Sequence, residues 1–121
     1  MIYFKNVSKV YDNGSVALDH ANVHIKKGEF VFVVGASGAG KSTFIKLLDH
    51  EELPTEGTVI VDGIDVTKLR KGRVPYLRRR MGIVFQDFRL LPNKTAEENV
   101  AFAMEVIEAP RRLIKERVRN V

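Results

Sequence analysis

Nine consecutive residues, Gly35 to Thr43, combine glycines, a lysine and hydroxyl side chains in a pattern suited to holding a phosphate chain. Gly35, Gly40, Lys41 and Ser42 occupy the fixed positions of G-x-x-x-x-G-K-[ST]. Glycines let backbone N–H groups approach an anion closely, the lysine adds a mobile positive charge, and the serine hydroxyl is a ligand for Mg²⁺. The pattern predicts a nucleotide site made of Gly35, Ala36, Ser37, Gly38, Ala39, Gly40, Lys41, Ser42 and Thr43.

The segments on either side of this loop favour a nucleotide site over a chance glycine-rich turn. Apart from Glu29, residues 29–34 form a continuous apolar run, which is typical of a strand buried in a parallel sheet. After the loop, apolar residues recur at helical spacing from Phe44 to Leu48, and the helix is expected to end near Asp49 and His50. The loop therefore lies between a predicted strand and a predicted helix.

Phosphoryl transfer at such a loop also needs an acidic group at the end of a second strand. Asp62 follows an apolar run, but Gly63 comes next and the alternation resumes, so a hairpin tip explains it better. Asp87 follows the apolar run 81–85 only after Gln86, whose amide oxygen can face Mg²⁺ or a water. We therefore assign the metal-binding aspartate to neither position. Tyr11 could stack on a base, although the pattern alone favours an ordinary turn tyrosine.

The remaining segments predict an α/β chain with an antiparallel part. Thr95 is expected to cap a helix, with Glu98 as its capping-box partner and a buried stripe at Val100, Ala103, Met104 and Ile107. Pro110 is expected to start a further helix. Strands are expected at residues 2–7, 16–25 and 81–85, and a hairpin at residues 58–66.

Composition restricts the class of protein. The chain has 121 residues, no cysteine and a net charge of +5, so it is one domain or part of one, with no disulfide framework. The N-terminus does not resemble a secretory signal and no apolar run is long enough to span a membrane, so membrane contact is expected to require a partner. Seven of the positive charges are crowded into residues 68–80, which predicts a solvated face, a contact with an acidic surface, or a nucleic-acid site.

Several segments together resemble the ATP-binding cassette (ABC) ATPases. The phosphate loop, the turn at residues 54–57, the hairpin with Asp62 and Gly63, and the run Gly82-Ile83-Val84-Phe85-Gln86 occur in the order found in that family. The opening residues 2–11 and the segment 74–91 look like the FtsE group of bacterial cell-division ATPases. The resemblance implies a P-loop NTPase core with an antiparallel β subdomain. It covers this whole chain but only the N-terminal half of such a protein, so residues 1–121 are expected to be part of one domain, with a helical subdomain starting near residue 95.

The resemblance also implies roles for single residues. Tyr11 would stack on adenine, against the preference of the pattern alone. Lys41 would contact the β- and γ-phosphates of ATP, and Ser42 would bind Mg²⁺. Gln86 would sense Mg²⁺ and the attacking water, which makes Lys41 and Gln86 the expected catalytic residues.

Partners follow from the same resemblance. The segment from Gln86 to Leu91 and the helix from Thr95 would dock an integral membrane protein resembling FtsX. The intact protein would form a homodimer and lie peripherally on the cytoplasmic face of the membrane. Nucleic acid is not favoured as a partner, because no aromatic residues interleave with the basic ones in a base-reading pattern.

Three features of the family are missing between residues 1 and 121: the Leu-Ser-Gly-Gly-Gln signature, an apolar strand ending in Asp-Glu, and a late switch histidine. Because the last apolar residue, Val121, has no cap after it, we expect the natural chain to continue. The 121-residue chain alone is expected to contact ATP but not to turn it over. Two alternatives remain open, a non-catalytic nucleotide-sensing module and a basic nucleic-acid-binding P-loop protein.

Overall fold

The computed structural model describes residues 1–87 and 89–121 and divides into two units, Met1–Met81 and Gly82–Val121, which we describe separately. Residue 88 belongs to the segment expected to dock a partner and lies outside the described residues. The strands of the first unit are β1 (Ile2–Val10), β2 (Val16–Ile25), β3 (Glu56–Val61) and β4 (Ile64–Asp65), and its helices are α1 (Lys41–Leu48), the 3₁₀ turns η1 (Val66–Lys68) and η2 (Lys71–Arg73), and α2 (Val74–Arg78). The second unit contains α3 (Ala96–Val106) and α4 (Arg111–Asn120).

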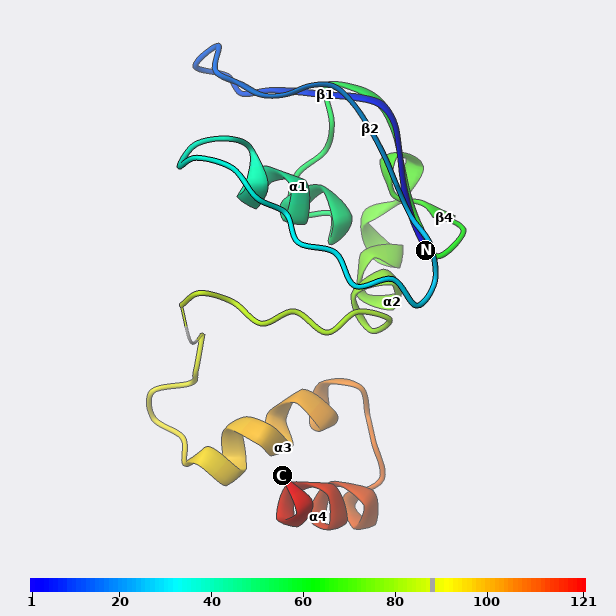
Figure 1. The fold of residues 1–121 in the computed structure, drawn as a ribbon. Coiled ribbons are helices and arrows are strands. Elements are labelled where there is room, and N and C mark those ends of the chain that lie inside the picture. Colours follow the sequence, from blue (N-terminus) through cyan, green and yellow to red (C-terminus); the bar gives the residue numbers. More distant parts are fainter. Residues whose placement is uncertain (88) are drawn as a thin grey trace. The chain divides into compact units, whose positions relative to one another are not determined.

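The strands form an antiparallel sheet in the order β2-β1-β3-β4 (Figure 1). In β1, Phe4 pairs with Val23 on one side and with Val59 on the other. Asn6 interrupts the alternation with a φ of 50°, so that Phe4 and Val7 are both buried although they lie three residues apart. This irregularity turns the apolar residues of β1 toward one face of the sheet.

The predicted hairpin forms between β3 and β4, and its tip is Asp62-Gly63. These two residues have φ values of 48° and 80°, as a two-residue hairpin turn with left-handed central residues requires. The Asp62 carboxylate forms an ion pair with Arg80. Asp62 is therefore a turn residue, as the sequence predicts.

Helix α1 lies against the sheet and completes the hydrophobic core of the first unit (Figure 1). The rings of Phe4 and Phe44 stack with their centroids 4.5 Å apart, and Leu47 is fully buried. The helix ends at Leu48, as the sequence predicts. The buried cluster comprises Phe4, Val7, Phe44, Leu47, Leu48, Val59, Val61, Val66 and Leu77.

Two predicted strands are not formed. Residues 29–34 and 81–85 are irregular, and three of their side chains, Phe30, Val34 and Val84, are 84%, 85% and 99% exposed. A strand of a parallel sheet is stabilised by ladders to its neighbours, and β1–β4 pair only among themselves within the described residues. Both segments are rich in apolar residues, but without a neighbouring strand this composition does not produce strand structure.

In the second unit, the capping box at the start of α3 is confirmed. The Thr95 hydroxyl accepts from the Glu98 N–H at 3.1 Å, and the Glu98 carboxylate accepts from the Thr95 N–H at 2.8 Å. The buried stripe predicted for α3 is wrong, because no residue of this helix is buried, and Val100 and Ile107 are 37% and 49% exposed. Within the described part of this unit only α4 packs on α3, so the stripe is half covered.

Helix α4 begins at Arg111, one residue after the predicted start, with Pro110 as its N-cap. Among the helices that the structure describes, none combines the length and the apolar character needed to cross a bilayer.

Candidate nucleotide-binding site

The loop from Gly35 to Thr43 is fixed where it enters α1. Gly40 is the N-cap of α1 with a left-handed φ of 81°, and no side chain caps the helix. A Cβ at Gly40 would lie 2.2 Å from the Ala17 carbonyl oxygen of β2, so only glycine allows this close approach. The first-turn N–H groups of α1 are thus left uncapped by side chains, in a geometry that favours an anion.

Lys41 folds back over the loop instead of extending into solvent. Its ammonium donates to the carbonyl oxygens of Gly35 at 2.8 Å and Ala36 at 2.6 Å. Its charge is therefore held within the loop, next to the start of α1, where the helix dipole also attracts negative charge. These groups together form a site suited to the phosphates of a nucleotide.

The two hydroxyl residues after Lys41 have different environments. Ser42 is exposed and its hydroxyl makes no hydrogen bond with the described residues, so it is free to bind a cation. Thr43 is only 6% exposed, and its Oγ1 is hydrogen-bonded to the Tyr11 hydroxyl at 3.0 Å. Thr43 can therefore face a ligand through its backbone N–H, while its side chain ties α1 to the end of β1.

The fit of Mg²⁺ to this site rests on Ser42. A neutral hydroxyl oxygen is a hard donor of the kind that Mg²⁺ accepts, together with phosphate oxygens and waters. Over residues 1–87 and 89–121, no group of three or more His, Cys, Asp or Glu side chains could hold a metal by itself. The described residues thus suit an ion bound mainly through the phosphates of a nucleotide, with Ser42 as one protein ligand.

Tyr11 lies near the loop, and a residue that the sequence analysis missed holds it there. The Lys9 ammonium lies 5.0 Å from the centroid of the Tyr11 ring. Lys9 also forms an ion pair with Glu52 at 2.8 Å and donates to the Leu53 carbonyl oxygen at 2.9 Å, and its side chain is only 14% exposed. The sequence does carry a signal for this contact. Lys9 and Tyr11 are two residues apart at the end of a strand, where side chains at that spacing lie on the same face.

Gln86 belongs to the second unit, whereas Tyr11 and the loop belong to the first. Gln86 is exposed in an irregular segment. Nearby, the Arg89 guanidinium lies 3.7 Å from the Phe85 ring centroid and 3.4 Å from the Asp87 carboxylate.

Comparison with known protein families matches one family model to most of this chain. The family model described as "ABC transporter" matches residues 18–120, which include the whole phosphate loop. The chain belongs to this family. Its N-terminal sheet and its phosphate loop are thus parts of an ABC ATPase cassette, as the sequence resemblance implies.

Two individual relatives show which members of the family the chain is similar to. The chain is 51% identical over 121 residues to "Cell division ATP-binding protein FtsE" of Bacillus subtilis (strain 168). The aligned region includes 100% of this chain and 53% of that protein. It is 41% identical to "Methionine import ATP-binding protein MetN" of Helicobacter pylori (strain ATCC 700392 / 26695). That alignment includes 100% of this chain and 37% of MetN.

Among solved structures, the ATP-binding cassette MJ0796, a dimer in a post-hydrolysis state bound to ADP and Pi, matches with a TM-score of 0.86 and 37% identity. That match covers 99% of this chain and 55% of MJ0796. The chain thus spans about half the length of the FtsE protein and the cassette it matches.

Proposed function

We propose that this chain is the ATP-binding half of an ABC ATPase that works in bacterial cell division. The observation that carries the proposal is the start of α1, where Lys41 folds over the loop and Gly40 leaves the first-turn N–H groups without a side-chain cap. The cell-division role is favoured over methionine import because identity to the FtsE relative is 51%, against 41% to the MetN relative.

In this proposal, the loop binds the β- and γ-phosphates of ATP through its N–H groups and Lys41. Tyr11 stacks on adenine, and the Lys9 ammonium on the ring supports its position. Ser42 and Gln86 are the proposed ligands of Mg²⁺, which when bound neutralises charge on the phosphates. Lys41 and the loop N–H groups stabilise the negative charge that develops on the transferred γ-phosphoryl group.

The proposed intact protein hydrolyses ATP as a homodimer on the cytoplasmic face of the membrane. Its partner is an integral membrane protein resembling FtsX, which docks at residues 86–91 and at the helix that follows Thr95. The 121 residues are the N-terminal portion of one ATPase domain, whose helical subdomain starts near residue 95. The Leu-Ser-Gly-Gly-Gln signature and the Asp-Glu pair are not among these residues. We therefore propose that the 121-residue chain alone binds ATP without turning it over.

A substitution in the loop tests the site. Lys41→Ala removes the charge held within the loop, and we expect Mg·ATP affinity measured by calorimetry to fall by about tenfold or more. Lys46→Ala is the matched control, because Lys46 lies in the last turn of the same helix and, among the described residues, its ammonium pairs with Glu51 at 3.6 Å and with no other carboxylate. Equal affinities for Lys41→Ala and the unmodified protein contradict the proposed site.

A second experiment separates base binding from phosphate binding at Tyr11. Tyr11→Ala should weaken ATP binding while leaving the affinity for inorganic tripolyphosphate nearly unchanged, because only ATP carries a base to stack. Tyr11→Phe keeps the ring but loses the hydrogen bond to Thr43, and should retain most of the ATP affinity. Parallel losses for ATP and tripolyphosphate in Tyr11→Ala indicate instead that Tyr11 acts by fixing the loop.

A further inference from the structure

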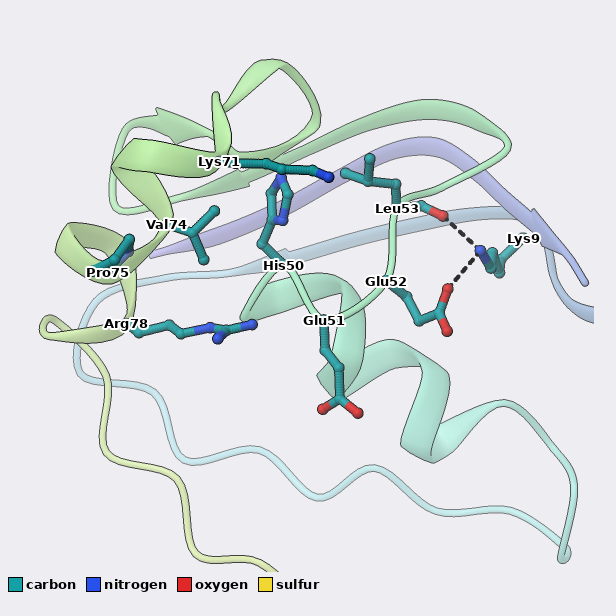
Figure 2. A pocket seen from close by; sticks show the side chains of 9 residues that line it. All are labelled: Lys9, His50, Glu51, Glu52, Leu53, Lys71, Val74, Pro75 and Arg78. Atoms are coloured by element: carbon teal, nitrogen blue, oxygen red, sulfur yellow. Dashed lines mark hydrogen bonds and ion pairs between the residues drawn. The ribbon is translucent and has the colours of Figure 1, made fainter.

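A groove that the proposed function leaves unused lies at the far end of α1 from the phosphate loop. The chain segment after α1, which includes Leu53, forms one side of it, and η2 and α2 form the other (Figure 2). Its volume is about 620 Å³. Because α1 is an eight-residue helix, Lys41 and this groove are separated by about 12 Å along the helix axis. We call this cavity the α1–α2 groove.

The negative charges of the α1–α2 groove are already neutralised. The Glu52 carboxylate pairs with Lys9 at 2.8 Å, and the Glu51 carboxylate pairs with Lys46 at 3.6 Å. Both carboxylates therefore have their counter-charge within the first unit. A ligand that enters the groove meets little free negative charge on this side.

Two positive charges of the groove have no such partner. Lys71 is exposed and makes no ion pair or hydrogen bond with the described residues. Arg78 donates from Nε to the Asp49 carbonyl oxygen at 2.9 Å. No carboxylate in the described part of the chain pairs with its guanidinium group, so its charge is not balanced there. Lys71 and Arg78 come from opposite ends of the η2–α2 segment, and both side chains border the groove in Figure 2.

The surface beside the groove also carries positive charge. From Val66 to Gln86 the chain contains no Asp or Glu. Of its basic residues, Lys68 pairs with Asp65 and Arg80 with Asp62, whereas Arg70 pairs with no described carboxylate. Tyr76 is 57% exposed, with the Arg73 and Arg79 guanidinium groups 5.7 and 5.5 Å from its ring centroid. An amphipathic ring among guanidinium groups is a composition that protein interfaces favour.

The groove also offers apolar surface. Pro75 lines it on the α2 side, next to Val74, which is only 9% exposed, and Leu53, which is 44% exposed, lines it opposite. An apolar surface between two unbalanced cations suits a chain segment that carries carboxylates and aliphatic side chains together. A flat lipid surface does not follow a groove. The aromatic ring that lines this one, His50, is half-buried, and its Nε2 lies 3.3 Å from the Leu69 carbonyl oxygen, so the ring offers little free face for a nucleic-acid base.

We propose that the α1–α2 groove is a docking site for an acidic, partly apolar peptide segment of a protein partner. Carboxylates of that segment pair with Lys71 and Arg78, and its aliphatic side chains cover Pro75 and Leu53. Arg70 and Arg73 extend the positive field around the groove and speed the encounter with an acidic partner. This site does not depend on nucleotide binding by the loop.

The test uses the protein as its gene encodes it and a short fluorescein-labelled peptide of alternating glutamate and leucine, with binding followed by fluorescence polarisation. We expect the peptide to bind, and Lys71→Glu to weaken it about tenfold or more, because a carboxylate then faces carboxylates. Lys71→Gln, which only removes the charge, should give a smaller loss. Lys115→Glu is the matched control, since Lys115 is exposed on α4 in the second unit and makes no described ion pair.

Each remaining outcome decides against the proposal. A peptide of alternating glutamine and leucine that binds equally well shows that charge does not direct the binding. Equal losses for Lys71→Glu and Lys115→Glu indicate attraction by net charge alone. Lys71-dependent binding of anionic phospholipid vesicles or single-stranded DNA, without binding of the acidic peptide, assigns the basic surface to another class of partner. Thermal unfolding monitored by circular dichroism identifies any variant that fails to fold.

Discussion

The two units of the chain are stabilised in different ways. In Met1–Met81, residues distant in sequence meet, and Phe4, Leu47 and Val59 are at most 1% exposed. In Gly82–Val121, no residue of α3 or α4 is buried, and the interactions that define the helices are local, such as the capping box at Thr95. The first unit therefore has a hydrophobic core of its own, whereas the second depends on helix ends and half-covered contacts.

The apolar runs 29–34 and 81–85 show what this difference teaches. Residues 29–34 lie in the first unit and are as apolar as β3, yet Phe30 and Val34 are more than four-fifths exposed. β3 differs from them because it has β1 on one side and β4 on the other. Strand formation in this chain thus follows from the presence of neighbouring strands more than from composition.

The largest expected effect comes from Gly57, which joins the connection after α1 to the sheet. A Cβ at Gly57 would lie 2.2 Å from the Asn6 carbonyl oxygen, and its φ is 87°. We expect Gly57→Ala to lower the free energy of unfolding of the first unit by about 3 kcal/mol, since both the clash and the left-handed conformation disfavour it. Urea denaturation followed by circular dichroism measures this change.

Gly63→Ala is the matched control for that substitution. Gly63 has a similar φ of 80°, but a Cβ there would have no atom within 4 Å. We expect a loss of only about 1 kcal/mol, from the backbone conformation alone. Equal losses at the two glycines would mean that the close approach of β3 to β1 contributes nothing to stability.

A pair of identical substitutions compares the two units directly. Val59 is 0% exposed in β3, and Val84 is 99% exposed in the second unit. We expect Val59→Ala to cost about 2 kcal/mol through lost burial and a cavity, and Val84→Ala to cost close to nothing. Thermal unfolding of both variants checks this, and a comparable loss at Val84 would indicate that residues 81–85 are packed in solution.

The local features of the fold were predictable from the sequence. The hairpin tip at Asp62-Gly63 and the cap at Thr95 each depend on a few adjacent residues whose side-chain chemistry fixes the backbone. The start of α1 follows the phosphate-loop pattern for the same reason. These turn, cap and loop patterns can be recognised without knowing which distant residues pack against them.

Features that depend on distant residues were predicted less well. The Tyr11–Thr43 hydrogen bond joins residues 32 apart, and the contact of Lys9 with Leu53 joins residues 44 apart. No periodicity in the sequence encodes either contact. Likewise, the exposure of residues 29–34 and of α3 depends on which other elements pack there, and an apolar pattern gives only the capacity for burial.

A smaller effect is expected from the cap of α3, because it holds one helix end and not a core. Thr95→Ala removes the acceptor of the Glu98 N–H, and we expect a loss of about 1 kcal/mol in the stability of α3. Thr95→Ser keeps the hydroxyl and should lose little. Amide hydrogen exchange in the first turn of α3 reports the change, and β1 should be unaffected. Faster exchange in β1 would show that the two units do not unfold independently.

The smallest effect concerns the titration of Glu98. The backbone N–H of Thr95 and the side chain of Lys94 both donate to its carboxylate, and they hold the pKa of Glu98 below its ordinary value of 4.5. Because the folded-state pKa is the lower one, the carboxylate stabilises the helix end fully above pH 4.5, and this contribution is lost as the pH falls through the folded-state pKa. The cap should therefore weaken only in acid, with faster amide exchange at the start of α3. Glu98→Gln does not titrate and should remove this pH dependence; a variant that keeps it would assign the titration to another group.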